Sequence, residues 1–159
     1  MIIGVIGGNR ADKQTSALAE EVGRRIAQSG ALLICGGLGG VMEAACKGAR
    51  AAGGLTVGLL PGDNRHEANP HVSVPIATGL GIARNVIVVR ASDVLIAIRG
   101  GYGTLNEIAA ALNLGKPVVA LATWDLPAAG EVNPALFFPV STPAEAVAKA
   151  IELAPRESA

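Results

Sequence analysis

The sequence predicts one α/β domain, residues 1–159, built on a doubly wound, mainly parallel sheet with helices on both faces. Short, nearly continuous apolar runs alternate with longer segments whose apolar residues recur at helical spacing. Strands without polar alternation are typical of a parallel sheet that is buried on both sides. Half of the residues are hydrophobic but only 3% are aromatic, so we expect an aliphatic, alanine-rich core.

The predicted strands and helices follow one another in order along the chain. Strands are expected at 2–8, 31–37, 55–62, 72–79, 93–101, 117–123 and 136–140, helices at 15–30, 40–54, 104–115 and 142–154, and loops at 63–71 and 125–135. The first helix carries Leu18, Val22 and Ile26 on one face. Gly30 then stands where a helix C-cap belongs. The segment 80–90 fits either a strand or a helix, because its β-branched residues favour the first and its length permits the second.

The charge balance argues against a macromolecular anion as the partner. Lys plus Arg and Asp plus Glu number 13 each, so the formal net charge is zero. Non-specific binding to nucleic acid rests on basic surfaces, and spanning a bilayer takes about 20 apolar residues in succession. We therefore expect neither nucleic acid nor membrane as a partner, although a local anion site remains compatible with this composition.

Cysteine and histidine offer little chemistry of their own. Cys35 and Cys46 are too few for a disulfide framework or a zinc site, and we expect buried free thiols in a reducing cytoplasm. His66 and His71 lie in a loop without a nearby cysteine or carboxylate cluster, so no metal site is expected.

Three predicted strands end in paired glycines: Gly7-Gly8, Gly36-Gly37 and Gly100-Gly101. The carboxyl ends of parallel strands meet at one edge of the sheet, where doubly wound proteins bind their ligands. A glycine turn that opens a helix lets backbone N–H groups approach an anion, and the helix dipole favours negative charge there. One such turn can serve merely as a tight turn. Three on one edge favour a phosphorylated ligand.

The residues expected to contact this ligand belong to the glycine turns or lie beside them. They are Gly7, Gly8, Asn9, Gly36, Gly37, Gly39, Gly40, Arg84, Arg99, Gly100, Gly101, Gly103, Thr104 and Glu107. Neither the lysine of a P-loop nor the G-x-G-x-x-G of a dinucleotide site is present, which disfavours an ordinary NAD site.

Glu107 has two interpretations at this level. Thr104 and Glu107 have the spacing of a capping box, in which a threonine caps a helix and a glutamate three residues later reaches back. Thr142 and Glu145 have the same spacing far from any glycine pair, so spacing alone does not give Glu107 a function. Its place directly after a glycine turn makes it a candidate ligand contact as well.

Two arginines lie near the predicted strand at 93–101, one before it and one close to its end. Arg84 either extends its charge from an apolar segment to solvent or clamps a phosphate with two N–H groups. Arg99 ends a buried strand just before the glycines, where a charge is difficult to place unless it faces a ligand or a partner.

The stretch from Gly100 to Glu107, GGYGTLNE, resembles the P-G-G-x-G-T-x-x-E motif of the Lonely Guy family. Its members are cytokinin-activating phosphoribohydrolases, often misannotated as lysine decarboxylases. The glycine-rich segment 36–54 and the tripeptide at 83–85 extend the resemblance over most of the chain. It implies a Rossmann-like fold, a helix over 80–91, and a homodimer or higher homo-oligomer. In an enzyme of this kind, Glu107 and Arg84 would be the catalytic residues that cleave the N-glycosidic bond.

The chain departs from the motif at two positions, because Arg99 replaces its proline and Asn85 replaces the lysine after the upstream arginine. In overall look it is similar to the molybdenum-cofactor carrier branch of the superfamily, which binds a phosphorylated pterin. The resemblance thus implies a binding protein for a phosphorylated nucleotide-like ligand, with molybdenum cofactor or a nucleotide as ligand and no cofactor required. The alternative is a nucleoside 5′-monophosphate phosphoribohydrolase.

Lysine decarboxylation is rejected on chemical grounds. A pyridoxal-phosphate enzyme needs a Schiff-base lysine in its site. Of the lysines, Lys47 and Lys149 fall in predicted helices and Lys116 at the start of a strand, on the wrong edge. Lys13 alone falls near the glycine turns, with nothing around it to tune its pKa.

Overall fold

The computed structural model describes residues 1–126 and 133–155, which form one sheet of seven strands with every neighbouring pair parallel. The strands are β1 Ile2–Gly7, β2 Leu32–Cys35, β3 Thr56–Leu60, β4 Val74–Ala77, β5 Val94–Ile98, β6 Val118–Leu121 and β7 Phe137–Val140. Their order across the sheet is β4-β3-β2-β1-β5-β6-β7. The predicted α/β class with a doubly wound sheet is confirmed.

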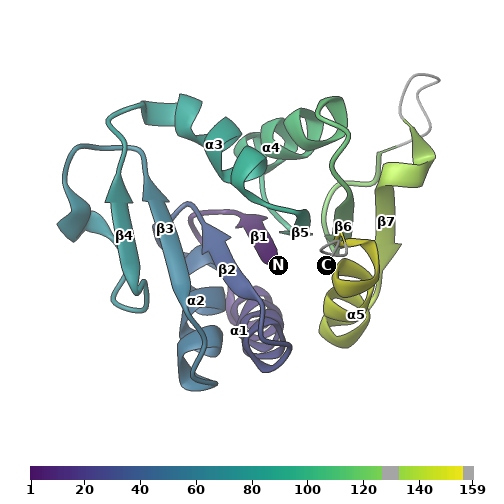
Figure 1. Cartoon of the computed structure of the whole chain (residues 1–159), viewed down its shortest axis with the longest axis horizontal. Coiled ribbons are helices and arrows are strands. Elements are labelled where there is room, and N and C mark those ends of the chain that lie inside the picture. Colours follow the sequence, from purple (N-terminus) through teal and green to yellow (C-terminus); the bar gives the residue numbers. More distant parts are fainter. Residues whose placement is uncertain (127–132, 156–159) are drawn as a thin grey trace.

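The helices lie on both faces of this sheet (Figure 1). They are α1 Lys13–Gln28, α2 Val41–Ala51, α3 Arg84–Ala91, α4 Tyr102–Asn113 and α5 Pro143–Leu153. Helices α1, α2 and α5 cover one face, with α1 in contact with both α2 and α5, whereas α3 and α4 cover the other face. Each face has its own aliphatic core, with side chains such as Ile3 and Ile96 on one side and Leu95 and Ile108 on the other, all fully buried.

The order of strands reverses between β1 and β5. From β1 the chain adds β2, β3 and β4 on one side, then returns to place β5, β6 and β7 on the other. At such a switch point the loops leaving the two central strands turn to opposite faces and open a crevice between them. The glycine pairs that follow β1, β2 and β5 all lie at this carboxyl edge, as the sequence predicts. We call it the ligand edge.

The predicted capping box at the start of α4 is wrong. Helix α4 begins at Tyr102 with Gly101 as its N-cap, so no side chain caps the first turn of this helix. Gly100, at φ +100°, and Gly101 complete the turn early, so Thr104 and Glu107 lie inside the helix and are buried. Strand β5 is correspondingly shorter than predicted and ends before Arg99.

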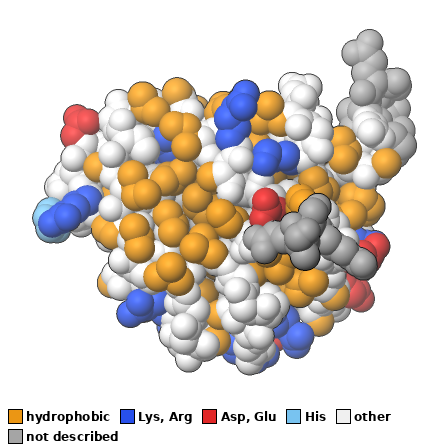
Figure 2. Space-filling view, in the orientation of Figure 1, with side chains coloured by type: hydrophobic (Ala, Val, Ile, Leu, Met, Phe, Trp, Pro, Cys, Tyr) orange, Lys and Arg blue, Asp and Glu red, His pale blue; other side chains and the backbone are white. Residues whose placement is uncertain are grey.

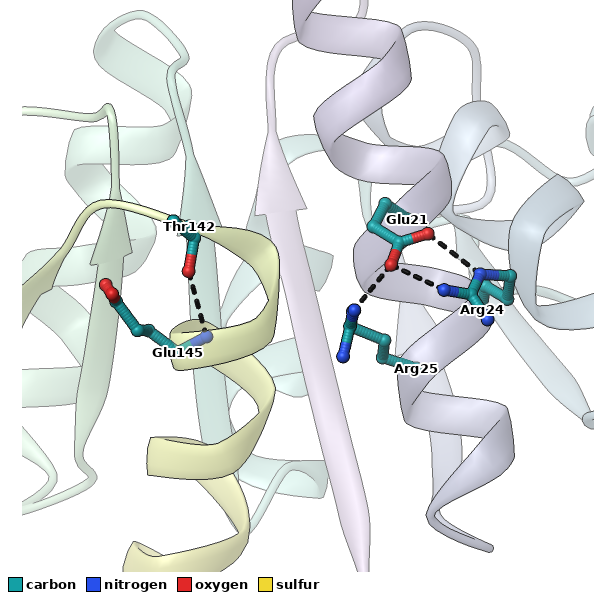
Figure 3. A network of polar contacts seen from close by, with 5 residues as sticks. All are labelled: Glu21, Arg24, Arg25, Thr142 and Glu145. Carbon is teal, nitrogen blue, oxygen red and sulfur yellow. Dashed lines mark hydrogen bonds and ion pairs between the residues drawn. The ribbon is translucent and has the colours of Figure 1, made fainter.

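The same spacing does form a cap at α5. The Thr142 hydroxyl oxygen accepts a hydrogen bond from the Glu145 N–H at 3.2 Å (Figure 3). The Glu145 carboxylate in turn accepts from the Ser141 N–H at 2.9 Å. Figure 3 also shows Glu21 of α1 paired with Arg24 and Arg25.

Other predicted segments agree with the structure. A 3-10 turn at Gly81–Ala83 leads into α3, so the ambiguous segment is helical, as the resemblance implies.

Cys35 and Cys46 are buried free thiols whose sulfurs lie 3.5 Å apart. Of the predicted loop at 125–135, residues 127–132 lie outside the described part of the chain. None of the helices in residues 1–126 and 133–155 is long and apolar enough to cross a membrane.

Candidate functional site

A cavity of about 290 Å³ opens at the ligand edge, where the ends of β1 and β2 meet the beginnings of α3 and α4. Among the residues predicted to bind ligand, those that line it are Gly7, Gly8, Asn9, Gly36, Arg84, Gly101, Gly103, Thr104 and Glu107. The structure thus brings together residues from the three glycine turns and the two residues that the Lonely Guy resemblance would make catalytic.

The other predicted contacts lie outside the cavity lining: Gly37, Gly39, Gly40, Gly100 and Arg99. Two of these glycines instead hold the first two turns together. The Gly39 N–H donates to Asn9 Oδ1 at 2.9 Å, and a Cβ on Gly40 would lie 2.3 Å from the Gly8 carbonyl oxygen.

Several lining residues were not predicted from the sequence: Val5, Ile6, Leu38, Met42 and Asn85. All of them except Asn85 are apolar, and these four form the apolar wall of the cavity. Their position just before or just after a glycine pair is a signal that sequence reasoning could have used for Val5, Ile6 and Leu38. Asn85 stood out only as a departure from the family motif.

Arg84 is the most unusual side chain of the site. It is the first residue of α3 and only 6% exposed, so it does not extend its charge into solvent. One terminal nitrogen, Nη1, donates to Asn85 Oδ1 at 2.9 Å. Its Nε is buried and has no hydrogen-bond partner within the described residues. A buried donor without an acceptor is costly, and here that cost falls on a residue that lines the cavity.

The guanidinium reaches from α3 to the end of β2. A Cβ on Gly36 would lie 2.5 Å from Arg84 Nη1 and 2.8 Å from its Cζ, so only glycine leaves room for the charge there. Burial lowers the pKa of Arg84, and the nearby Glu107 carboxylate partly opposes this shift. An arginine begins so far above neutrality that the guanidinium remains charged at pH 7.

Glu107 lies on α4, is 6% exposed and lines the same cavity. Burial raises its pKa to about 7, against the opposing effect of the Arg84 charge. The carboxyl group is therefore close to half-protonated at neutral pH. It can either accept a hydrogen bond from a ligand hydroxyl or amine, or donate one.

Arg84 and Glu107 do not neutralise each other by direct contact. The ion pairs found within residues 1–126 and 133–155 join other side chains. Both groups nevertheless line one cavity. A ligand in this cavity could place a negative charge near Arg84 and a polar group near Glu107.

Arg99 lies outside this cavity on the exposed surface. It follows β5 in a left-handed conformation with φ of +46°, and its Nη2 lies 3.5 Å from Gln14 Oε1 of α1. Its charge also helps to hold the pKa of the Asp12 carboxyl below its usual value, although hydrogen bonding to Thr15 is the larger cause. The structure therefore places Arg99 at the rim of the ligand edge.

These features define a Rossmann-like α/β protein with a small cavity, lined by both apolar and polar residues, at its topological switch point. The chain belongs to the SLOG cluster4 family, which it matches over residues 1–151. The resemblance to the Lonely Guy superfamily that the glycine motifs predict is confirmed.

Two solved structures resemble nearly the whole chain. The molybdenum cofactor binding protein of Rippkaea orientalis is 43% identical, with a TM-score of 0.86 over 95% of this chain and 94% of that one. The molybdenum cofactor carrier protein of Chlamydomonas reinhardtii is 40% identical, with a TM-score of 0.86 over 96% of each chain.

A third relative is an enzyme. The cytokinin riboside 5′-monophosphate phosphoribohydrolase of Mycobacterium tuberculosis is 38% identical over 117 residues, which are 67% of this chain and 62% of that protein. The chain thus spans less than two thirds of the enzyme's length.

Proposed function

We propose that this protein binds a phosphorylated, nucleotide-like ligand in the cavity at the ligand edge, in the manner of a molybdenum-cofactor carrier. The observation that carries the proposal is Arg84, a buried cation whose Nε has no acceptor and which lines a cavity built from glycine turns. A phosphate oxygen is the acceptor that a guanidinium binds best. Similarity to a cofactor-binding and a cofactor-carrier protein over nearly the whole chain supports this reading.

The helices around the cavity favour an anion as well. Helices α2, α3 and α4 all begin at the ligand edge, so their N-termini lie near it. A helix N-terminus carries a partial positive charge and unpaired N–H groups. Together with Arg84, these ends make the ligand edge electropositive although the chain as a whole is neutral.

Hydrolysis of a nucleoside 5′-monophosphate is the second candidate function. One observation favours it: Glu107 is buried beside the cavity with a pKa of about 7, which suits proton transfer at neutral pH. Its carboxylate would take a proton from the water that attacks the ribose C1′. The bond from C1′ to the base nitrogen would break, and the base would leave with that electron pair and gain a proton.

Three observations place hydrolysis second. Glycosidic hydrolysis commonly employs two carboxylates, and Glu107 is the only acidic residue that lines the described cavity. Asn85 occupies the position of the motif lysine, and Arg99 that of the motif proline. Two solved structures that resemble nearly the whole chain are those of a cofactor-binding and a cofactor-carrier protein.

One pair of assays separates the two functions. Adenosine 5′-monophosphate and a phosphorylated pterin, added separately, should each raise the melting temperature if they bind the native state. Release of free adenine is followed by chromatography for the wild type and for Glu107→Gln. A thermal shift without free base supports a binding protein. Adenine released by the wild type but not by Glu107→Gln would make the protein a hydrolase, and no shift with either compound would contradict both proposals.

We also propose that the protein forms a homo-oligomer through an exposed apolar face. Hydrophobic side chains gather over β3, β4 and α3, with cationic side chains mainly around the margin (Figure 2). The exposed large hydrophobic residues of β4, α3 and the segment between them are Val74, Ile76, Leu80, Ile82, Val86 and Ile87. A large apolar patch marks an interaction site. An apolar face can meet its own copy without bringing like charges together.

A further inference from the structure

An exposed pair of aromatic side chains lies beside the cavity. Tyr102 and Trp124 stack with their ring centroids 6.1 Å apart and their planes at 26°. They are the single tyrosine and the single tryptophan of the chain. Tyr102 is 85% exposed, so one aromatic ring of a protein with very few is presented to solvent.

The aromatic pair is held at the cavity rim by its backbone. Tyr102 lies between Gly101 and Gly103, and both of these glycines line the cavity. The Trp124 indole N–H donates to the Gly101 carbonyl at 3.3 Å, which fixes the segment after β6 against the third glycine turn. The hydroxyl of Thr123 donates to the Arg99 carbonyl at 2.5 Å, which is a second hydrogen bond between the segment after β6 and the segment after β5.

This rim also contains unusual backbone conformations. Arg99 has φ of +46° and Ala122 φ of +50°, and they are the non-glycine residues with positive φ in residues 1–126 and 133–155. Such conformations are unfavourable for L-residues and persist where the surroundings impose them, often beside a binding site. Arg99 lies shortly before Tyr102 in the chain, and Ala122 lies shortly before Trp124.

The cavity itself is small for a nucleotide-like ligand and offers no aromatic surface for its ring. Its volume of about 290 Å³ lies at the lower end of ligand pockets, which hold roughly 300–1,000 Å³. No aromatic side chain is among its lining residues in the described chain. The phosphorylated end would occupy the cavity, and a planar ring attached to it would emerge at the rim.

We infer that Tyr102 and Trp124 form the surface on which the planar heteroaromatic ring of the ligand stacks, while its phosphorylated end contacts Arg84. The ligand class is a phosphorylated purine or pterin, since both present a flat π-face. Stacking on an aromatic side chain tolerates different rings because every such base has that face. This inference rests on the proposed binding function and adds the subsite that reads the ring.

Trp124 provides a direct measurement because it is the only tryptophan. Its fluorescence is followed while adenosine 5′-monophosphate, a phosphorylated pterin or ribose 5-phosphate is added, with the pterin titration corrected for its own absorbance. Ribose 5-phosphate carries the phosphate and sugar without a ring. We expect quenching by the two ring-bearing compounds and little change with ribose 5-phosphate, whose binding is measured by calorimetry.

Variants at Tyr102 separate stacking from a structural role. Tyr102→Ala should weaken adenosine 5′-monophosphate about tenfold or more while changing the affinity for ribose 5-phosphate less than twofold. Tyr102→Phe keeps the ring and should retain affinity. Because the side chain is exposed, the alanine variant should fold, and its melting temperature checks this.

The outcomes distinguish this inference from the function on which it rests. If adenosine 5′-monophosphate and the pterin bind but neither depends on Tyr102 nor quenches Trp124, the proposed function stands and the stacking surface is refuted. An equal loss of affinity for all three compounds in Tyr102→Ala would show that the pair only supports the rim. If none of the compounds binds the wild type, the proposed function and the inference fail together.

Discussion

Arg84 illustrates the cost in stability that the proposed binding site carries. A buried donor without a partner costs about 1–3 kcal/mol, and a buried cation costs more unless it is paired. In this protein Glu107, whose charge acts on Arg84, forms no ion pair with it and is partly protonated at neutral pH. The free protein therefore holds a charge that a bound phosphate would satisfy.

The first prediction concerns Arg84→Met. Because methionine fills similar space without a charge, the variant should bind adenosine 5′-monophosphate at least tenfold more weakly while its melting temperature stays equal or rises. Calorimetry and thermal unfolding measure the two effects. Arg90→Met, on the same helix but exposed, is the matched control and should leave binding unchanged. Undiminished binding by Arg84→Met would contradict the role given to this residue.

The second prediction concerns pH and Glu107. Its pKa of about 7 in the folded protein is raised from an ordinary 4.5, because burial disfavours the carboxylate. The folded state then holds a proton that the unfolded state has released. Stability should therefore fall as pH rises from about 4.5 through about 7, by on the order of 3 kcal/mol.

Glu107→Gln is the control for this pH dependence, since its amide does not titrate. Urea unfolding of both proteins at pH 5 and pH 8 gives the test. The wild type should lose stability relative to the variant at the higher pH and be close to it at the lower. Parallel pH profiles would show that Glu107 is not buried as the structure has it.

At the scale of elements, the packing of α1 on α2 depends on two helical glycines. A Cβ on Gly23 would lie 1.9 Å from the Ala45 carbonyl oxygen, and one on Gly48 would lie 1.8 Å from that of Glu20. Backbone meets backbone at these points, so a side chain would force the helices apart. α2 begins directly after the second glycine turn, and this contact therefore also positions the ligand edge.

The third prediction compares two glycine-to-alanine changes. Alanine stabilises a helix relative to glycine by about 1 kcal/mol where there is room. Gly103→Ala in α4 has open space, with no atom within 4 Å of the new Cβ, and should be neutral or stabilising. Gly23→Ala should destabilise by about 1–3 kcal/mol through overpacking. Equal stability of the two variants in urea unfolding would contradict the close packing of α1 on α2.

The sequence predicts most elements but not all of their ends. Apolar runs and helical spacing identify the strands and most helices, because burial on a sheet imposes those patterns. Thr142 and Thr104 have the same local spacing, yet only Thr142 caps a helix. At Thr104 the turn formed by Gly100 and Gly101 starts the helix two residues earlier, at Tyr102. Local residue propensity does not predict the conformation of that glycine turn.

The site is predictable in part for a related reason. Parallel topology alone brings the three glycine pairs to one edge, so the place of the ligand edge follows from the sequence. The unpaired Nε of Arg84, the apolar wall with Met42 and the rim position of Arg99 depend on three-dimensional packing. Segment 80–91 is assigned as a helix by resemblance, since its β-branched composition is compatible with a strand.

At the scale of the whole molecule, the exposed apolar face and the lining of the cavity share no residue. The fourth prediction is that the wild type is a homo-oligomer in solution and that Ile82→Asp with Ile87→Asp yields monomers. A buried charge at an interface is costly without a partner. Ile151→Asp changes an isoleucine on α5 that is about as exposed as Ile87 and is the control. Light scattering coupled to size exclusion measures the mass, and a monomeric wild type would contradict the proposed interface.

If the proposed function is correct, the three glycine turns jointly hold the phosphorylated end of a ligand. Amide chemical shifts recorded during a titration with adenosine 5′-monophosphate test it most directly. We predict saturable shifts at Gly7, Gly36 and Gly101, one from each turn, and none at Gly30 or Gly115, which follow helix ends at the opposite edge. Saturable shifts confined to other parts of the protein, or no shifts at millimolar ligand, would contradict the claim.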